Sequence, residues 1–168
     1  RNEATLIIAL DCGIKEHKKI NYAKEKGIEM IVCDHHNTGD SLPNAEAVLD
    51  PKRKDCEYPY KELSGCGVGY KFMQAFCQKK NIPLNRLENF LDLVAVSIAS
   101  DIVPITGENR ILALHGLRKL SSNPIVGLKS IIKTAGLNNI NIQISDIVFK
   151  IGPRINAAGR IDYGRKSV

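Results

Sequence analysis

Residues 5–36 read TLIIALDCGIKEHKKINYAKEKGIEMIVCDHH, and this stretch decides the fold. It contains two short apolar runs, residues 5–10 and 28–33, each typical of a buried parallel strand. The polar segment between them, residues 16–26, has its few apolar residues spaced for one face of a helix. A strand, a helix and a strand within about 30 residues predict a βαβ unit, whose strands are parallel and whose crossover is right-handed.

The rest of the chain continues this sheet briefly and then becomes helical. Residues 45–49 form a further short strand candidate, which Asp50 and Pro51 close. Apolar residues then recur at helical spacing, and breakers separate the segments. Helices are predicted to begin at residues 64–67 and to cover residues 84–98, 109–120 and 125–135. Residues 138–142 are expected to be a loose surface connection. The fold class is therefore α/β, with a parallel sheet and flanking helices followed by a helical subregion.

Composition narrows the class of protein. Of the 168 residues, 43% are hydrophobic and 25% are charged, which is typical of a globular domain with a working core. No apolar run approaches the roughly 20 residues that a membrane span needs, so no membrane partner is expected. The net charge of +6 and the pI near 9.1 favour a polyanionic partner such as nucleic acid. Charge alone would equally describe a merely basic protein.

The cysteines bear on the cellular compartment, and the chain ends bear on whether the sequence belongs to a longer protein. The five cysteines are an odd number, and they include no CxxC pair. Reduced thiols in a cytoplasmic protein are therefore expected. The first residues have neither a starter Met nor the layout of a signal peptide, and no apolar helix closes the chain. Both ends are interpreted as boundaries inside a longer protein.

Acidic residues follow two neighbouring strands of the predicted sheet. Asp11 stands at the end of the first strand, and Asp34 stands at the end of the second, where His35 and His36 follow it. Parallel neighbours lie roughly 4.8 Å apart, and ligands bind beyond their carboxyl ends, so these side chains should converge. One such Asp alone could be an ordinary turn or cap residue. Carboxylate with imidazole suits Mn, Fe or Zn, and carboxylate-rich sets favour Mn or Mg.

A zinc site built from cysteine has to be considered as well. Cys12 and Cys33 each neighbour a proposed ligand. Cys33 is one step from Asp34, which in a strand puts it on the opposite face. No CxxC spacing supports zinc, so both thiols are expected to be small, buried apolar groups.

Asp101 is a candidate for a further ligand. It ends the predicted 84–98 helix, in the sequence ASDIVP. A helix-end acid is commonplace, but an acid with apolar residues on both sides is costly to bury unless it is paired or metal-bound.

Residues 152–160, GPRINAAGR, have the most unusual composition of the chain. Two arginines, an asparagine and two flanking glycines could allow close backbone approach to a phosphate and bidentate contacts with it. The plainer alternative is a solvated turn between helices. By contrast, the glycines of residues 64–69 match neither a dinucleotide-binding pattern nor a P-loop, and they indicate a tight entry into a helix.

These motifs, in this order, resemble the RecJ family of the DHH phosphoesterases. The tripeptide Asp34-His35-His36 is similar to the signature that names the superfamily. The segments LDCG at 10–13 and ASDIVP at 99–104 resemble its neighbouring acidic motifs. The segments SGCGV at 64–68 and GPRINAAGR at 152–160 resemble RecJ in particular. The resemblance covers essentially the whole chain.

The resemblance implies a function and a set of roles. It implies a roughly five-stranded parallel DHH domain with two Mn or Mg ions, acting as a 5′–3′ exonuclease on single-stranded DNA in repair and recombination. It also implies that single-strand-binding protein and a helicase are partners. Asp11 would bridge the ions, and His35 and Asp101 would ligate one of them. His36 would lie beside the scissile phosphate, and Asp34 would be a ligand or an orienting acid. Arg154 and Arg160 would hold phosphate, and Asn156 would contact the nucleic acid with them.

The resemblance also sets the domain organisation. Residues 1–168 would form one incomplete DHH catalytic domain. The family's first acidic motif would precede Arg1, and its DHHA1 domain would follow Val168. The chain by itself is therefore expected to bind Mn weakly and to be inactive.

Two rival functions stay open. One is a small-substrate DHH phosphodiesterase that acts on oligoribonucleotides or cyclic dinucleotides, and residues 152–160 argue against it. The other is a non-catalytic replication scaffold of DHH origin. That interpretation is disfavoured because a scaffold has no need of the combined set Asp11, Asp34, His35, His36 and Asp101.

Overall fold

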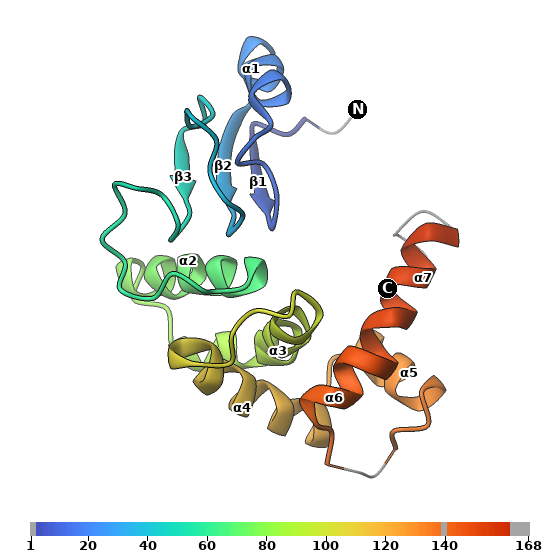
Figure 1. Cartoon of the computed structure of the whole chain (residues 1–168). Coiled ribbons are helices and arrows are strands. Elements are labelled where there is room, and N and C mark those ends of the chain that lie inside the picture. The colour runs from blue at the N-terminus through green and yellow to red at the C-terminus, as the bar shows by residue number, and fades with distance from the viewer. Residues whose placement is uncertain (1–2, 139–140, 162–168) are drawn as a thin grey trace. The chain divides into compact units, whose positions relative to one another are not determined.

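The computed structural model describes residues 3–138 and 141–161, and for residues 158–161 it describes the backbone alone. The chain divides into two compact units, Arg1–Pro83 and Leu84–Val168 (Figure 1). The first unit holds the sheet and helix α2 (Gly65–Lys79), and the second is helical, so the predicted change from strands to helices falls inside the first unit, before this division. In the part of the chain that the structure describes, no helix is both long and apolar enough to cross a membrane.

The first unit is built on the predicted βαβ unit, which is confirmed. Strands β1 (Leu6–Leu10) and β2 (Glu29–Cys33) pair in parallel, and helix α1 (His17–Glu25) connects them. Strand β3 (Ala47–Leu49) pairs in parallel with β2, which gives the order β1-β2-β3. The described residues thus contribute three strands, where the family resemblance implied about five.

Strand β1 is more exposed than its sequence predicts. Its large apolar side chains, Leu6, Ile7, Ile8 and Leu10, are between 39% and 52% exposed. The reason is position, because β1 lies at one end of the strand order and has a neighbour on one side only among the residues placed by the structure. The prediction of a buried strand is therefore wrong for β1. It is correct for the second half of β2, whose last two residues are fully buried.

Helix α2 (Gly65–Lys79) runs past the carboxyl ends of the strands (Figure 1). It begins where predicted, at Ser64, whose Oγ accepts a hydrogen bond from the N–H of Gly67 at 3.2 Å. The apolar residues of this helix are only partly buried, because Met73 and Phe76 are 40% and 42% exposed. The buried face consists mainly of glycines and other small residues, which lets the helix approach the strands closely.

The second unit consists of helices. The predicted helix over 84–98 is divided into a 3₁₀ helix and an α-helix, and the segment after residue 143 is helical where no helix was predicted. Its elements are η1 (Leu84–Phe90), α3 (Leu91–Ser100), α4 (Gly107–Ser122), α5 (Val126–Thr134), α6 (Ile144–Asp146), the π-helix η2 (Ile147–Ile151) and α7 (Gly152–Ile161).

One apolar core holds these helices together, with residues from α3, α4, α5 and η2. Ile142 belongs to this core and is 3% exposed, so the loose surface connection predicted for residues 138–142 is wrong at this position. Asp92 is also fully buried, and its carboxylate accepts the N–H of Leu93 at 2.9 Å and of Ile125 at 2.8 Å. Through these two hydrogen bonds, Asp92 links the start of α3 to the start of α5.

Candidate metal centre

Three aspartates lie in one row at the carboxyl edge of the sheet. The last residues of β1, β2 and β3 are in register, and the residue after each is an aspartate: Asp11, Asp34 and Asp50. The convergence predicted for Asp11 and Asp34 follows from this parallel pairing. The third member, Asp50, was not predicted as a site residue, although it was visible as a third acid closing a strand.

Asp34 is buried, 1% exposed, and its carboxylate is fully engaged. Oδ2 accepts the N–H of Ile14 at 2.9 Å. Oδ1 accepts the N–H groups of His35 at 2.8 Å and His36 at 3.2 Å, and it lies 2.6 Å from Nδ1 of His36. Burial by itself would raise the pKa of Asp34, but these hydrogen bonds outweigh it and hold the pKa below its ordinary value.

The ionisation of Asp34 determines which ring nitrogen of His36 carries a proton. An ionised carboxylate can only accept hydrogen bonds, so the 2.6 Å contact places a proton on Nδ1 of His36. In the neutral ring, Nε2 then carries the lone pair and is the atom offered to a ligand. A carboxylate behind a histidine is the common way of orienting a metal-binding imidazole. This geometry agrees with one of the two roles predicted for Asp34, that of an orienting acid, and the role itself stays a prediction.

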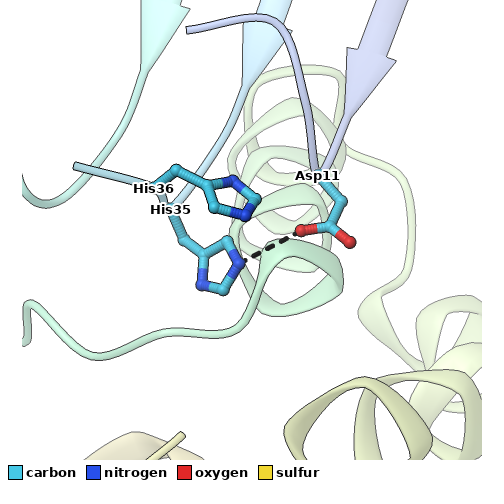
Figure 2. Close-up of side chains that lie close together, drawn as sticks. All are labelled: Asp11, His35 and His36. Atoms are coloured by element: carbon cyan, nitrogen blue, oxygen red, sulfur yellow. Dashed lines mark ion pairs between the residues drawn. The ribbon is translucent and has the colours of Figure 1, made fainter. Parts of the chain in front are cut away.

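Asp11 differs from Asp34 in almost every respect. Its side chain is 48% exposed, and its backbone has a φ of 64°, in the left-handed region. Its N–H donates to the carbonyl of Cys33 at 2.9 Å, which keeps the turn close to β2. One carboxylate oxygen lies 3.2 Å from Nε2 of His35, whose side chain is 9% exposed (Figure 2).

Asp11, His35 and His36 form a cluster of potential metal ligands. Each offers one ligand atom, and these atoms all lie within 4.8 Å of one another (Figure 2). The two imidazole rings meet edge to face, with centroids 4.6 Å apart. One carboxylate oxygen and two ring nitrogens are donors that suit Mn, Fe or Zn. The residues present therefore fit a divalent cation.

Asp50 stands at the other side of Asp34 and is 3% exposed. Its Oδ1 accepts the N–H of Lys52 at 2.8 Å, while its buried Oδ2 has no hydrogen-bond partner. Burial raises the pKa of Asp50, and the charge of Asp34 acts in the same direction, against the hydrogen bond from Lys52. Only one oxygen of the Asp50 carboxylate thus accepts a hydrogen bond, whereas both oxygens of the Asp34 carboxylate do.

The two cysteines beside the cluster behave differently from each other. Cys33 is fully buried, and burial raises the pKa of its thiol to about 11, so it is a core residue as predicted. Cys12 is exposed, so the prediction of a buried thiol is wrong there. No cysteine belongs to the potential ligand group found among the described side chains, and the zinc alternative gains no support.

Asp101 is placed at the end of α3, as predicted, but it is exposed. Its N–H donates to the carbonyl of Ser97 at 2.9 Å, and its Oδ2 accepts from the Ser97 hydroxyl at 3.0 Å. The expectation of a costly buried acid is therefore wrong. Asp101 belongs to the second compact unit, and its role as a further ligand stays a prediction.

Residues 152–160 lie in helix α7, so the solvated turn, which was the plainer alternative, is not observed. Gly152 has an ordinary helical φ of −55°. Arg154 is exposed, and its Nη1 donates to the carbonyl of Lys150 at 2.7 Å. Asn156 is exposed two positions later, a spacing that does not share a helix face. The side chain of Arg160 lies outside the described residues. The contacts to the DNA strand predicted for these three residues stay predictions.

Comparison with known proteins places the chain in a family. Residues 2–98 match the N-terminal domain of the DHH family. The chain belongs to the DHH family. The matched residues contain Asp11 and the signature at 34–36, so the cluster of Asp11, His35 and His36 lies inside the DHH domain.

Several relatives of this chain are exonucleases named RecJ. The chain is 38% identical over 169 residues to the single-stranded-DNA-specific exonuclease RecJ of Escherichia coli, covering 95% of the chain and 29% of that protein. It matches RecJ of Thermus thermophilus in complex with Mn²⁺ at a TM-score of 0.82 and 31% identity, over 97% of the chain and 24% of that one. The complex with Mg²⁺ from the same organism matches at 0.70 and 25%, over 97% and 22%. The chain thus spans less than a third of the length of these relatives.

Proposed function

We propose that this chain is the DHH part of a metal-dependent exonuclease that degrades single-stranded DNA from its 5′ end. The observation that carries the proposal is the cluster of Asp11, His35 and His36 at the carboxyl edge of a parallel sheet. The similarity to RecJ over 95% of the chain supports the choice of substrate. The net charge of +6 supports a polyanionic substrate as well.

Asp11 and His35 would hold divalent cations, with Asp11 as the shared ligand. Asp11 is suited to this role because its side chain is about half exposed and one of its carboxylate oxygens lies 3.2 Å from Nε2 of His35. Mn²⁺ or Mg²⁺ bound there would activate a water and stabilise the charge that develops on the phosphate. A ligand shared by two cations needs an accessible carboxylate, and the 48% exposure of the Asp11 side chain supports this role.

His36 would act next to the scissile phosphate, and Asp34 would orient it. The hydrogen bond from Nδ1 of His36 to Asp34 directs Nε2 away from the loop, and the His36 side chain is 58% exposed. Nε2 can therefore accept or return a proton near the reacting oxygen. Because Asp34 is buried and already accepts several hydrogen bonds, its contribution is to fix the ring and keep its tautomer.

The second unit would supply the remaining contacts to the strand. Asp101 is exposed at the end of α3, so its carboxylate can serve as a terminal ligand. Arg154 and Asn156 are exposed on α7, and Arg160 follows on the same helix. We assign the two arginines to phosphate and Asn156 to the strand. Guanidinium groups bind phosphate oxygens bidentately, which an ammonium cannot do.

The proposal extends to the cellular setting. We place the activity in a longer, cytoplasmic protein that combines this DHH part with further acidic and DNA-clamping segments, and we propose single-strand-binding protein and a helicase as its partners. The free cysteines support a reducing compartment.

The test is single-turnover cleavage by the full-length protein that contains this chain. The substrates are DNA single strands labelled at the 5′ or the 3′ end, duplex DNA, a short oligoribonucleotide and a cyclic dinucleotide, each with Mn²⁺, with Mg²⁺ and with EDTA. We expect metal-dependent release of nucleotides from the 5′ end of single-stranded DNA. His36→Ala should slow cleavage by about 100-fold or more, the scale of general acid–base catalysis. Asp40→Asn, at an exposed acid outside the cluster, is the matched control and should leave the rate unchanged.

The other outcomes identify the rival functions. Preference for the oligoribonucleotide or the cyclic dinucleotide over DNA would replace the proposal by a small-substrate phosphodiesterase. Absence of cleavage on every substrate, together with absence of Mn²⁺ binding by calorimetry, would indicate the non-catalytic scaffold.

A further inference from the structure

The first turn of α2 lies directly against the Asp11 side chain, at Gly65. Gly65 is buried, and a Cβ built on it would stand only 2.6 Å from the Cβ of Asp11. Real Cβ atoms essentially never approach another heavy atom this closely. The conflict involves the Cβ of Asp11 as well as the carboxylate, so a rotation of the aspartate about χ1 cannot remove it. Any side chain at position 65 must therefore displace the backbone of the turn after β1 or of α2.

The turn that carries Asp11 has little freedom to move. Its residue 11 has a φ of 64°, a conformation that few residues adopt, and its N–H is bonded to the carbonyl of Cys33. On the other side, α2 is anchored by Ser64, which is fully buried and caps the helix through Gly67. The Asp11 carboxylate is held between these two supports and faces Nε2 of His35 (Figure 2).

We infer that Gly65 is a positioning residue of the metal centre, because the absence of a side chain there lets Asp11 rest on α2 and face His35. This inference rests on the proposed role of Asp11 as a metal ligand. It also accounts for the glycine-rich start of α2 at this position, where the sequence indicated only a tight entry into a helix. The role of Gly65 is therefore indirect, because it would act through the position of Asp11.

The experiment compares two substitutions in the same helix, made in the full-length protein. Gly65→Ala introduces the conflict with Asp11. Gly69→Ala, one turn further along, is the matched control, because a Cβ there would meet only the end of the Leu10 side chain, at 3.1 Å. Both changes replace a buried glycine of α2 by alanine, so both add the same methyl group to the same helix. Mn²⁺ binding is measured by calorimetry, and unfolding by urea is measured in metal-free buffer.

We expect Gly65→Ala to weaken Mn²⁺ binding by at least about 10-fold, the size of effect seen when groups that support a metal ligand are altered, while Gly69→Ala binds as the wild type does. A Mn²⁺ affinity of Gly65→Ala equal to that of Gly69→Ala would overturn the inference. A wild-type protein that binds no Mn²⁺ would refute the proposed metal centre instead, and urea unfolding would still test the contact between Gly65 and Asp11.

A second pair of variants, made in a protein that carries Asp11→Gly, tests whether the effect of Gly65→Ala on stability depends on Asp11. Asp11→Gly removes the opposing Cβ and suits the positive φ at this position. In that background, Gly65→Ala should cause no loss of stability, whereas in the wild-type background it should lower the urea midpoint or prevent folding. If the double variant is as unstable as Gly65→Ala alone, the contact with Asp11 is not the cause and the inference fails.

Discussion

The turns after β1 and β2 both begin with an aspartate, yet the two acids are in opposite situations. Asp34 is 1% exposed and accepts hydrogen bonds from Ile14, His35 and His36. Asp11 is 48% exposed and faces one imidazole. Both stand in the same row of the sheet, so register alone does not distinguish them. The difference arises from the surroundings, because the backbone of the β1 turn folds back over Asp34 while Asp11 is left at the surface.

This contrast separates a residue that builds the site from a residue that is available to bind. A carboxylate whose oxygens are occupied by backbone N–H groups stabilises its loop and has little capacity left for a cation. A half-exposed carboxylate beside a histidine contributes little to stability but can exchange its contacts for a metal ion. We therefore expect substitutions of Asp11 and Asp34 to damage different properties.

Asp11→Asn should have the largest effect, and the effect should be on catalysis. Asparagine keeps the size of the side chain and tolerates a positive φ, so the turn should survive. Loss of the charged ligand should lower the rate of Mn²⁺-dependent cleavage by about 1000-fold, while the free energy of unfolding changes by less than about 0.5 kcal/mol. Single-turnover assays and urea denaturation measure the two quantities. Asp101→Asn should be milder, and equal, mild losses for both would mean that Asp11 is only a turn residue.

In contrast to Asp11→Asn, the substitution Asp34→Ala should cause a large loss of stability. The N–H of Ile14 and the N–H of His35 would lose their acceptor in a buried place. We expect the free energy of unfolding to fall by about 3 kcal/mol, measured by urea denaturation with Asp40→Ala as the exposed control.

The loss of stability caused by Asp34→Ala should depend on pH. The pKa of Asp34 is lowered in the fold, so its contribution to stability is complete above the ordinary value of 3.8 and is lost as the pH falls through the folded-state pKa. The difference in stability between wild type and Asp34→Ala should therefore shrink on acidification below about pH 4. A difference that is constant down to about pH 2 would assign the loss to packing.

Asp50→Asn should have the smallest effect, and it should be stabilising. The pKa of Asp50 is raised in the fold, so its ionisation opposes folding more strongly as the pH rises from 3.8 through the folded-state value. Removing that charge should increase the free energy of unfolding at about pH 7 by about 1 kcal/mol and change it little near pH 3. A loss of stability at neutral pH would show that the Asp50 carboxylate has a partner in solution.

The sequence predicted the place of the site better than the roles within it. Parallel strands end at one edge, so Asp11 and Asp34 could be brought together from their positions in the chain. Their different environments depend on contacts that no local pattern contains. The N–H of Ile14 bonds to Asp34 across 20 positions, and the position of Gly65 against Asp11 spans more than 50. Whether an acid is buried or exposed follows from such contacts.

The fold shows the same division between local and non-local information. The periodicity of the chain predicted the βαβ unit and most helices, because period is a local property. Burial of β1 was overestimated, since a run of apolar residues reveals nothing about how many strands flank it. The helical conformation of residues 152–160 was missed because glycine and proline suggested a break. Pro153 does not break the helix here, since it follows the π-helix η2 in a stretch that is helical without interruption from Ile144 to Ile161.

The exposed strand β1 has a consequence for the behaviour of this chain in solution. Its apolar side chains lie on a strand that, among the residues the structure describes, is paired along one edge only. Such an edge is a template on which another polypeptide can add a strand. At high concentration the chain should therefore self-associate in a way that salt does not prevent, since backbone hydrogen bonding and apolar burial drive it. Colloidal stability would then depend on how β1 is shielded rather than on the net charge of +6.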